Sequence, residues 1–167
     1  DRRSATVAIL YQVAGEGTRA LSLLRRGDIL KILGPLGRPF DVSHHRKNIV
    51  LVAGGIGIAP IRFLLEHLKR LAAEERPGIS LYAGAKTAGE LFGLEGLEPF
   101  CREVHVCTDD CSVGRHGLVT EPLAENLAAF PLDDTVIYAC GPAGMIRELA
   151  ALLRDHPVPC QVSLEER

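Results

Sequence analysis

Two glycine-rich turns hold the residue types that could bind a nucleotide. The first turn follows an apolar run from Ile49 to Ala53 and consists of Gly54, Gly55, Ile56, Gly57, Ile58, Ala59 and Pro60. A buried strand, a turn with few side chains and a helix start would leave backbone N–H groups exposed, and the helix dipole favours negative charge there. The pattern therefore predicts a phosphate or pyrophosphate site. The alternative is that the glycines only permit close packing.

The second turn joins a later strand to another helix. It consists of Tyr138, Ala139, Cys140, Gly141, Pro142, Ala143, Gly144 and Met145. Gly141 would allow a ligand ring to approach the backbone, and Cys140 would lie at the tip of the strand. In the alternative interpretation Cys140 is a small buried hydrophobic residue, and Pro142 is an ordinary first-turn proline.

Two further loops, at 84–90 and 108–117, follow predicted strands. Open parallel sheets bind ligands beyond the carboxyl ends of their strands. The candidate binding residues in these loops are Gly84, Ala85, Thr108, Asp109 and Asp110. The two carboxylates could accept a hydrogen bond from a ribose hydroxyl and would repel a 2′-phosphate, which favours NAD over NADP. Arg115 is close in sequence and leaves NADP open.

The cysteines follow no metal-binding pattern. The sequence has Cys101, Cys107, Cys111, Cys140 and Cys160. The spacing of the first three is not that of a standard zinc or iron–sulfur site, so we predict no metal site here. An odd number of cysteines outside a small disulfide scaffold favours reduced thiols, and hence the cytoplasm. The adjacent His44 and His45 would point apart on an extended chain, which favours a solvated linker.

Composition argues against several classes of function. The 167 residues have a formal net charge of -2 and no strongly basic block, so nothing supports nucleic-acid binding. No apolar run approaches the roughly 20 residues that span a bilayer, and no signal peptide is visible. The single methionine is Met145. Asp1 is therefore not a translational start, and we expect the chain to be part of a longer protein.

From residue 48 onward, predicted strands alternate with predicted helices. Apolar and β-branched runs predict five strands, at 49–53, 79–85, 103–108, 135–140 and 158–164. Apolar residues three and four apart predict helices at 58–73, 120–129 and 142–154, with short helical pieces near 88–92 and 94–100. Thr120 is expected to cap the second of these helices. The alternation predicts an α/β fold with a five-stranded doubly wound parallel sheet.

The first part of the chain has a different pattern. Residues 5–13 and 29–33 are predicted to be strands, separated by a short helix from Arg19 to Arg26 that Thr18 caps. These elements cannot form a complete core and would leave sheet edges open. We therefore interpret this part as the end of a β-rich domain whose earlier strands lie before Asp1.

Taken together, the two turns resemble the motifs of the ferredoxin–NADP reductase superfamily. That superfamily has G-G-x-G-x-x-P after the first strand of its NAD(P) domain and C-G-P-x-x-M after a later strand, and both motifs match here. The resemblance implies an NAD-binding α/β domain at residues 47–160. It also implies that residues 1–46 are the C-terminal part of an antiparallel FAD-binding β-barrel.

Other segments are similar to the electron-transfer subunit of dihydroorotate dehydrogenase type B. These segments are 15–18, 33–37, 108–110, 117–120 and 160–167. In that family the last strand leads into a cysteine cluster that holds a [2Fe–2S] centre. Residues 161–167 are therefore expected to lead into an iron–sulfur domain whose ligands lie beyond Arg167, and Cys160 is not expected to be a ligand.

The resemblance assigns two groups of binding residues. Those expected at FAD are Leu10, Tyr11, Gln12, Gly17 and Thr18. Those expected at NAD are Gly54, Gly55, Gly57, Ile58, Ala59, Pro60, Gly84, Ala85, Thr108, Asp109, Asp110, Cys140, Gly141, Pro142 and Met145. The family often has Arg in place of Gln12, which weakens a charge contact there. Cys140 is expected to lie nearest the reacting nicotinamide carbon and to act by positioning, because cofactors perform hydride transfer.

The same resemblance implies a function. An FMN-containing catalytic subunit would oxidise dihydroorotate, and electrons would pass through the [2Fe–2S] centre and FAD to NAD in pyrimidine biosynthesis. The two kinds of subunit are expected to form a heterotetramer. The alternatives are a related NAD(P)H:flavin, ferredoxin or sulfite reductase subunit, and a non-catalytic nucleotide-binding module. The chain alone is expected to be inactive and to bind FAD weakly or not at all.

Overall fold

The computed structural model describes residues 6–34, 36–43, 46–71 and 76–164. The chain divides into two compact units, residues 1–39 (unit 1) and residues 40–167 (unit 2), and each is considered by itself. Phe40 packs edge-on against Tyr138 with ring centroids 5.2 Å apart, and the Tyr138 hydroxyl donates to the Asp41 carbonyl. These contacts hold the start of unit 2 against its sheet. The functional division of the chain at residue 46 stays a prediction.

Unit 2 is built on a six-stranded parallel sheet, so the prediction of five strands is wrong by one. The strand order is β4-β3-β2-β1-β5-β6, and every neighbouring pair is parallel. The strands are β1 Asn48–Gly54, β2 Gly78–Ala85, β3 Glu103–Thr108, β4 Arg115–His116, β5 Thr135–Cys140 and β6 Cys160–Ser163. The additional strand, β4, has two exposed residues and only pairs with the end of β3. An element so short carries no periodic pattern that a sequence could reveal.

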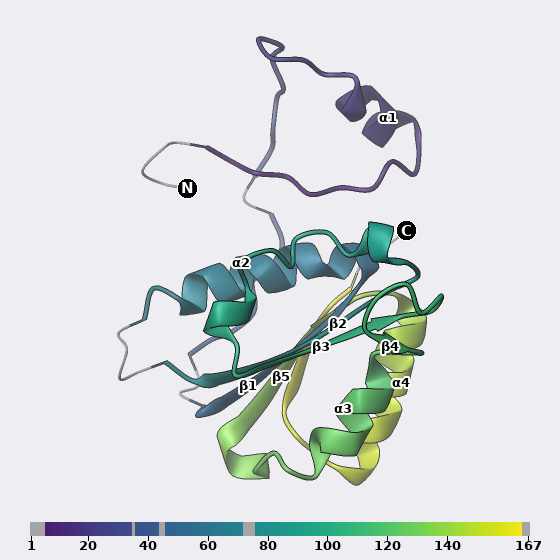
Figure 1. Cartoon of the computed structure of the whole chain (residues 1–167). Coiled ribbons are helices and arrows are strands. Elements are labelled where there is room, and N and C mark those ends of the chain that lie inside the picture. Colours follow the sequence, from purple (N-terminus) through teal and green to yellow (C-terminus); the bar gives the residue numbers. More distant parts are fainter. Residues whose placement is uncertain (1–5, 35, 44–45, 72–75, 165–167) are drawn as a thin grey trace. The chain divides into compact units, whose positions relative to one another are not determined.

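Helices cover both faces of the sheet, as predicted for a doubly wound fold. Figure 1 shows α2 (Ile58–Leu68) on one face and α3 (Thr120–Leu127) and α4 (Ala143–Asp155) on the other. Short 3-10 turns complete the connections, at Gly55–Gly57, Ala88–Glu90, Glu98–Phe100 and Leu132–Asp134. The predicted cap of α3 is wrong, because Val119 is the N-cap. The hydroxyl of Thr120 instead donates to Glu148 Oε2 of α4, at 2.8 Å.

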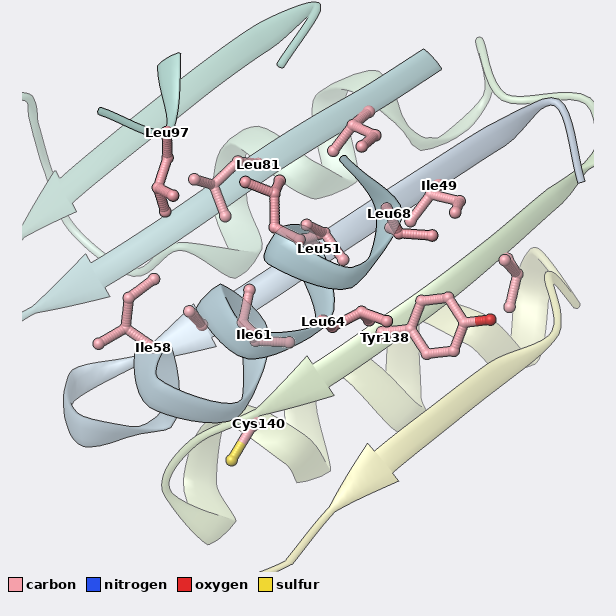
Figure 2. Close-up of a cluster of buried hydrophobic side chains, with 14 residues drawn as sticks. Ile49, Leu51, Ile58, Ile61, Leu64, Leu68, Leu81, Leu97, Tyr138 and Cys140 are labelled. Atoms are coloured by element: carbon pink, nitrogen blue, oxygen red, sulfur yellow. The ribbon is translucent and has the colours of Figure 1, made fainter. Parts of the chain in front are cut away.

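The alternation of β1 side chains creates two cores. Ile49, Leu51 and Ala53 pack with the α2 face, whereas Val50 and Val52 pack with α3 and α4. A central parallel strand buried on both faces is an apolar run throughout, which is why the sequence predicted it. Figure 2 shows the first core, where Ile58, Ile61, Leu64 and Leu68 of α2 meet side chains of the sheet. Burial of each large aliphatic side chain contributes about 1.5–3 kcal/mol.

The strand register brings the carboxyl ends of four strands to one edge. Gly54 at the end of β1 lies opposite Gly84 of β2, and Ala53 lies opposite Cys140 at the end of β5. The chain leaves β1 for β2 on one side, while β5 pairs with β1 on the other. The winding of the sheet therefore reverses between the carboxyl ends of β1 and β5. Open α/β sheets bind ligands at such a point.

Unit 1 contains one helix, α1 (Glu16–Ser22), and its described residues form no strand. The predictions of strands at 5–13 and 29–33 are therefore wrong for the residues described. A strand requires backbone partners, and the side chains of Val7 and Ile29 are 75% and 89% exposed. Thr18 lies in the third position of α1, not at its cap. Its hydroxyl accepts hydrogen bonds from the N–H groups of Ala14 and Gly15, at 2.9 and 3.1 Å.

A polar cluster spans β2 and β3. Ser80 Oγ donates to Glu103 Oε1 at 2.6 Å, and His105 Nε2 lies 3.2 Å from Glu103 Oε2. His105 also stacks on Tyr82, with ring centroids 4.5 Å apart. The hydrogen bond from Ser80, together with the neighbouring His105, lowers the pKa of Glu103 from its ordinary value although burial acts in the opposite direction. The folded chain therefore favours the ionised form of Glu103.

We expect Leu81→Ala to destabilise unit 2 by about 2–5 kcal/mol, because the substitution leaves a cavity around a side chain that is fully buried in the α2 core. The matched control is Phe63→Ala on α2, where the side chain is 78% exposed and the change should stay within about 0.5 kcal/mol. Urea unfolding followed by circular dichroism measures both. Equal losses for the two variants would contradict this description of the core.

We expect Glu103→Gln to reduce the loss of unfolding free energy that the wild type shows as the pH falls below neutral. A carboxyl group with a lowered pKa in the folded state adds stability above its unfolded pKa and loses it as the pH falls through the folded pKa. The variant should therefore be less stable than the wild type at pH 7, and the difference should shrink towards pH 3. Urea midpoints across this range provide the test, with the exposed Glu90→Gln as the control. A constant difference at all pH values would refute the assignment.

Candidate functional site

The two predicted turns contact each other through their backbones. A Cβ atom added at Gly57 would lie 2.1 Å from the carbonyl oxygen of Cys140. One added at Gly54 would lie 2.8 Å from Pro142 Cδ, and one at Gly141 would lie 3.0 Å from the nitrogen of Gly54. These three glycines are therefore required for the packing of the turns. The close-packing interpretation holds for them, and it also explains how the ends of β1 and β5 come together.

Gly55 differs from the other glycines of this turn. Its φ is +53°, in the left-handed region that favours glycine, and a Cβ atom added there would meet nothing within 4 Å. The following helix, α2, has no side-chain cap at its N-terminus and no acidic residue in its first turn. Bare backbone at Gly55 and an uncapped helix start fit an anionic group such as a pyrophosphate.

The side chain of Cys140 is buried rather than exposed to the edge. It is 3% exposed and belongs to the same core cluster as Ile58 and Ile61, and Figure 2 shows these three residues at the carboxyl end of the sheet. The part of Cys140 that contacts the other turn is its backbone carbonyl. The placement of Cys140 nearest a nicotinamide carbon stays a prediction. Its side chain packs in the hydrophobic core.

The loop after β3 is held by its own polar residues. Thr108 is fully buried, and its hydroxyl donates to the Val113 carbonyl at 2.7 Å and accepts from the Val113 N–H at 3.2 Å. Asp110 Oδ1 accepts hydrogen bonds from the Ser112 N–H at 3.0 Å and from Ser112 Oγ at 2.5 Å. These bonds lower the pKa of Asp110. Thr108 and Asp110 therefore build the loop. Asp109 and Asp110 are both exposed, but only Asp110 accepts the hydrogen bonds from Ser112.

The loop after β2 is tied to the loop after β3. The N–H groups of Asp109 and Asp110 donate to the carbonyls of Ala85 and Lys86, at 3.1 and 3.2 Å. Ser112 Oγ accepts a further bond from the Ala88 N–H at 2.7 Å. Sequence reasoning did not identify Ser112 as part of the site. The spacing Asp110-Cys111-Ser112, in which an aspartate bonds the backbone two residues on, is the signal that could have found it.

The structure gathers the predicted NAD residues at one edge of the sheet, whereas the predicted FAD residues belong to unit 1. The former all lie at or just beyond the carboxyl ends of β1, β2, β3 and β5. The latter, Leu10, Tyr11, Gln12, Gly17 and Thr18, lie within residues 1–39. The Thr18 hydroxyl is already used within its own turn, since it also donates to the Gly15 carbonyl at 3.1 Å. The assignment of these five residues to FAD stays a prediction.

No metal-binding group is present in the described part of the chain, where three or more His, Cys, Asp or Glu side chains never gather closely enough to hold an ion. Two grooves of unit 2 lie along α4. One runs between α3 and α4 near Leu127 and His156, and the other between α4 and β6 near Leu153 and Val162. Of the helices described, none has the length and apolar character needed to cross a membrane.

Comparisons with known proteins agree with this geometry. The family model for the oxidoreductase NAD-binding domain matches residues 51–151. The dihydroorotate dehydrogenase B (NAD(+)) electron transfer subunit of Caldanaerobacter subterraneus is 38% identical over the whole chain, which covers 62% of that protein. A probable subunit of the same kind from Methanopyrus kandleri is 39% identical over 93% of this chain and 56% of its own length. The chain thus spans about three fifths of these relatives.

Solved structures show the same fold. A structure of the NADH-dependent reduced ferredoxin–NADP oxidoreductase superposes with a TM-score of 0.78 at 31% identity, over 94% of this chain and 54% of that chain. The CS-b5R domains of human Ncb5or in the NAD+ form superpose with a TM-score of 0.75 at 21% identity, over 92% of this chain and 47% of theirs. The second likeness supports the fold alone.

We expect Gly57→Ala to destabilise unit 2 by more than about 3 kcal/mol, because the added methyl group would meet the rigid backbone of Cys140 and Gly141. Gly57 has φ of -59°, so the effect would come from space and not from backbone strain. Gly144→Ala in α4 is the matched control. Nothing lies within 4 Å of its added methyl, and the helix should be unchanged or up to about 1 kcal/mol more stable. Thermal unfolding measures both, and a Gly57→Ala variant as stable as the wild type would contradict the contact.

Proposed function

Because the chain belongs to the oxidoreductase NAD-binding domain family, we propose that unit 2 binds NAD(H) across the edge formed by β1, β5 and β2. The observation that carries this proposal is the backbone contact between Gly57 and Cys140, which joins the two turns at the point where the winding of the sheet reverses. A dinucleotide has a pyrophosphate between two nucleosides, and this edge offers one turn for the pyrophosphate with loops on both sides.

Each part of the dinucleotide has a proposed contact. The pyrophosphate binds at the backbone of Gly55 and the N-terminus of α2, where no acidic side chain opposes it. The nicotinamide lies against the backbone of Cys140 and Gly141. The adenosine ribose lies near Asp109, whose exposed carboxylate can accept a hydrogen bond from a ribose hydroxyl.

The chemistry belongs to the cofactor, and the chain positions it. When bound, NAD supplies a nicotinamide carbon that can accept or donate a hydride. The residues of the two turns contribute by orientation: they hold one face of the ring against backbone and leave the other open to the reaction partner. The buried side chains of Cys140 and Ile58 keep water away from the covered side. No general acid or base is required for this step.

The wider role follows from the relatives. We propose that the chain is part of an electron-transfer subunit with NAD, FAD and a [2Fe–2S] centre as cofactors. Its partner is an FMN-containing catalytic subunit that oxidises dihydroorotate in pyrimidine biosynthesis, within a cytoplasmic heterotetramer. Relatives at 38% and 39% identity carry the name of that electron transfer subunit. The described residues contain no ligand set for an iron–sulfur centre, so none of them is proposed as a ligand of that centre.

A second candidate function has its own support. The 31% identity and TM-score of 0.78 to the NADH-dependent reduced ferredoxin–NADP oxidoreductase favour a reductase that exchanges electrons with ferredoxin. A module that only binds a nucleotide is a third candidate, from another class of function. The three differ in what reduces or oxidises the bound nicotinamide.

The experiment that separates these candidates uses the full-length protein with its co-purified partners. We expect NAD reduction that depends on added dihydroorotate. NAD(P) reduction by reduced ferredoxin without dihydroorotate would support the second candidate instead. Binding of NAD with no electron transfer from either donor would support the nucleotide-binding module.

We expect the chain to bind NADH at least about tenfold more tightly than NADPH, because a carboxylate beside a 2′-phosphate is repulsive. Asp109→Ser should lower the ratio of the dissociation constant of NADPH to that of NADH, mainly by improving the binding of NADPH. Asp110→Ser should instead disturb the loop, because Asp110 bonds Ser112. Fluorescence titration of both nucleotides provides the measurement. Asp133→Asn, which lies before β5 at the opposite end of the sheet, is the control, and a ratio insensitive to Asp109→Ser would exclude the proposed ribose contact.

A further inference from the structure

Met145 lies where the two turns meet, and we propose that it is a positioning residue that holds Gly54 and Gly141 in their relative positions. This inference rests on the proposed binding of NAD(H). Met145 acts on the bound dinucleotide through the two turns, because it fills the gap between them. A direct contact of Met145 with the dinucleotide is not required. The consequence is that Met145 controls whether the nicotinamide and the pyrophosphate can be held at the same time.

The position of the thioether carries this proposal. A Cβ atom added at Gly54 would lie 2.8 Å from Met145 Sδ, and one added at Gly141 would lie 2.5 Å from Met145 Cε and 3.0 Å from Sδ. One side chain therefore occupies the space that both glycines leave empty. Gly54 ends β1 and Gly141 follows β5, so the thioether touches the two strand ends that flank the candidate site.

The helix explains how Met145 reaches this place. It is the third residue of α4 (Ala143–Asp155), and helical side chains tilt towards the N-terminus of their helix. The side chain thus points back over the turn that precedes α4. Its inner part packs against the α3–α4 core, in which Leu149 is buried. An unbranched thioether suits a narrow and irregular gap of this kind better than a branched side chain.

The contacts predict a specific effect of removing this side chain. The backbone contact of Gly57 with Cys140 remains, and Leu149 still anchors α4 in the core, so unit 2 should stay folded. The turns that follow β1 and β5 would lose the side chain that packs against both Gly54 and Gly141. Each turn could still bind its own part of the dinucleotide, but the two parts would no longer be held at matched positions.

The test compares two probes on the full chain, NADH and ADP-ribose, because ADP-ribose has the pyrophosphate and adenosine but no nicotinamide. We expect Met145→Ala to weaken NADH binding by about fivefold to tenfold, the range typical of coupling between contacting groups, with ADP-ribose affected less than about twofold. Met145→Leu, which has a similar volume but a branched side chain, should restore only part of the loss. The matched control is Ile146→Ala, a partly buried neighbour on α4 that packs into the same core and should leave the ratio of the two affinities unchanged.

A double substitution sharpens the test. Gly141→Ala should also lower the NADH affinity selectively, since its methyl group would overlap Met145 Cε. Adding Met145→Ala removes that overlap but not the 3.0 Å approach to the Gly54 nitrogen, so the double variant should recover only part of the NADH affinity that Gly141→Ala loses. Amide hydrogen exchange gives a ligand-independent measure. In Met145→Ala the amides of 54–57 and 140–142 should exchange faster, while those in the middle of β1 and β5 should not.

The different failures can be told apart. If the wild-type chain binds neither probe, the proposed function fails and this inference falls with it. If the wild type binds both probes but Met145→Ala lowers the affinity for NADH and for ADP-ribose equally, only the role of Met145 is overturned. The same holds if Ile146→Ala lowers the affinity for NADH more than that for ADP-ribose. Unchanged hydrogen exchange at the two turns in Met145→Ala would overturn it as well.

Discussion

The structure of unit 2 depends on one contact, in which the backbone of Gly57 lies against the carbonyl of Cys140. This contact joins the ends of the neighbouring strands β1 and β5, where the winding of the sheet reverses. Any side chain larger than hydrogen at residue 57 would separate the two turns. Because the turns meet so closely, their exposed backbone can act as one surface, and a ligand longer than either turn can bind across both.

The same contact shows that packing and binding are not alternative explanations of the glycines. Gly54, Gly57 and Gly141 are needed for the approach of the turns, whereas Gly55 has open space and a positive φ. A glycine cluster can therefore contain both kinds of residue. The loop after β3 also contains both kinds of residue. Thr108 and Asp110 are bonded within the loop, whereas the exposed Asp109 does not bond Ser112.

Sequence reasoning succeeded where local pattern and final environment agree. The apolar run at 49–53 predicted β1 because a strand buried on both faces is apolar at every position, and the spacing of Ile61, Leu64 and Leu68 predicted α2. It failed where neighbours decide the outcome. Residues 29–33 have the composition of a strand, yet they have no strand partner among the described residues. Thr18 and Thr120 were expected to be N-caps, but each lies inside its helix. The Thr18 hydroxyl accepts from the N–H groups of Ala14 and of the N-cap Gly15, and the Thr120 hydroxyl donates to Glu148.

Apart from the two-residue strand β4, the sequence by itself determined the order of strands and helices in unit 2, the two motifs and the residues that carry them. Only the tertiary structure decided that Gly57 touches Cys140, that Met145 fills the space over Gly54 and Gly141, and that Asp109 rather than Asp110 is free of the hydrogen bonds to Ser112 that build the loop. The physical reason is that these relations join residues far apart in the chain or depend on hydrogen bonds within and between loops. The contacts of Gly57 and Met145 follow from strand order and register, which no local pattern encodes.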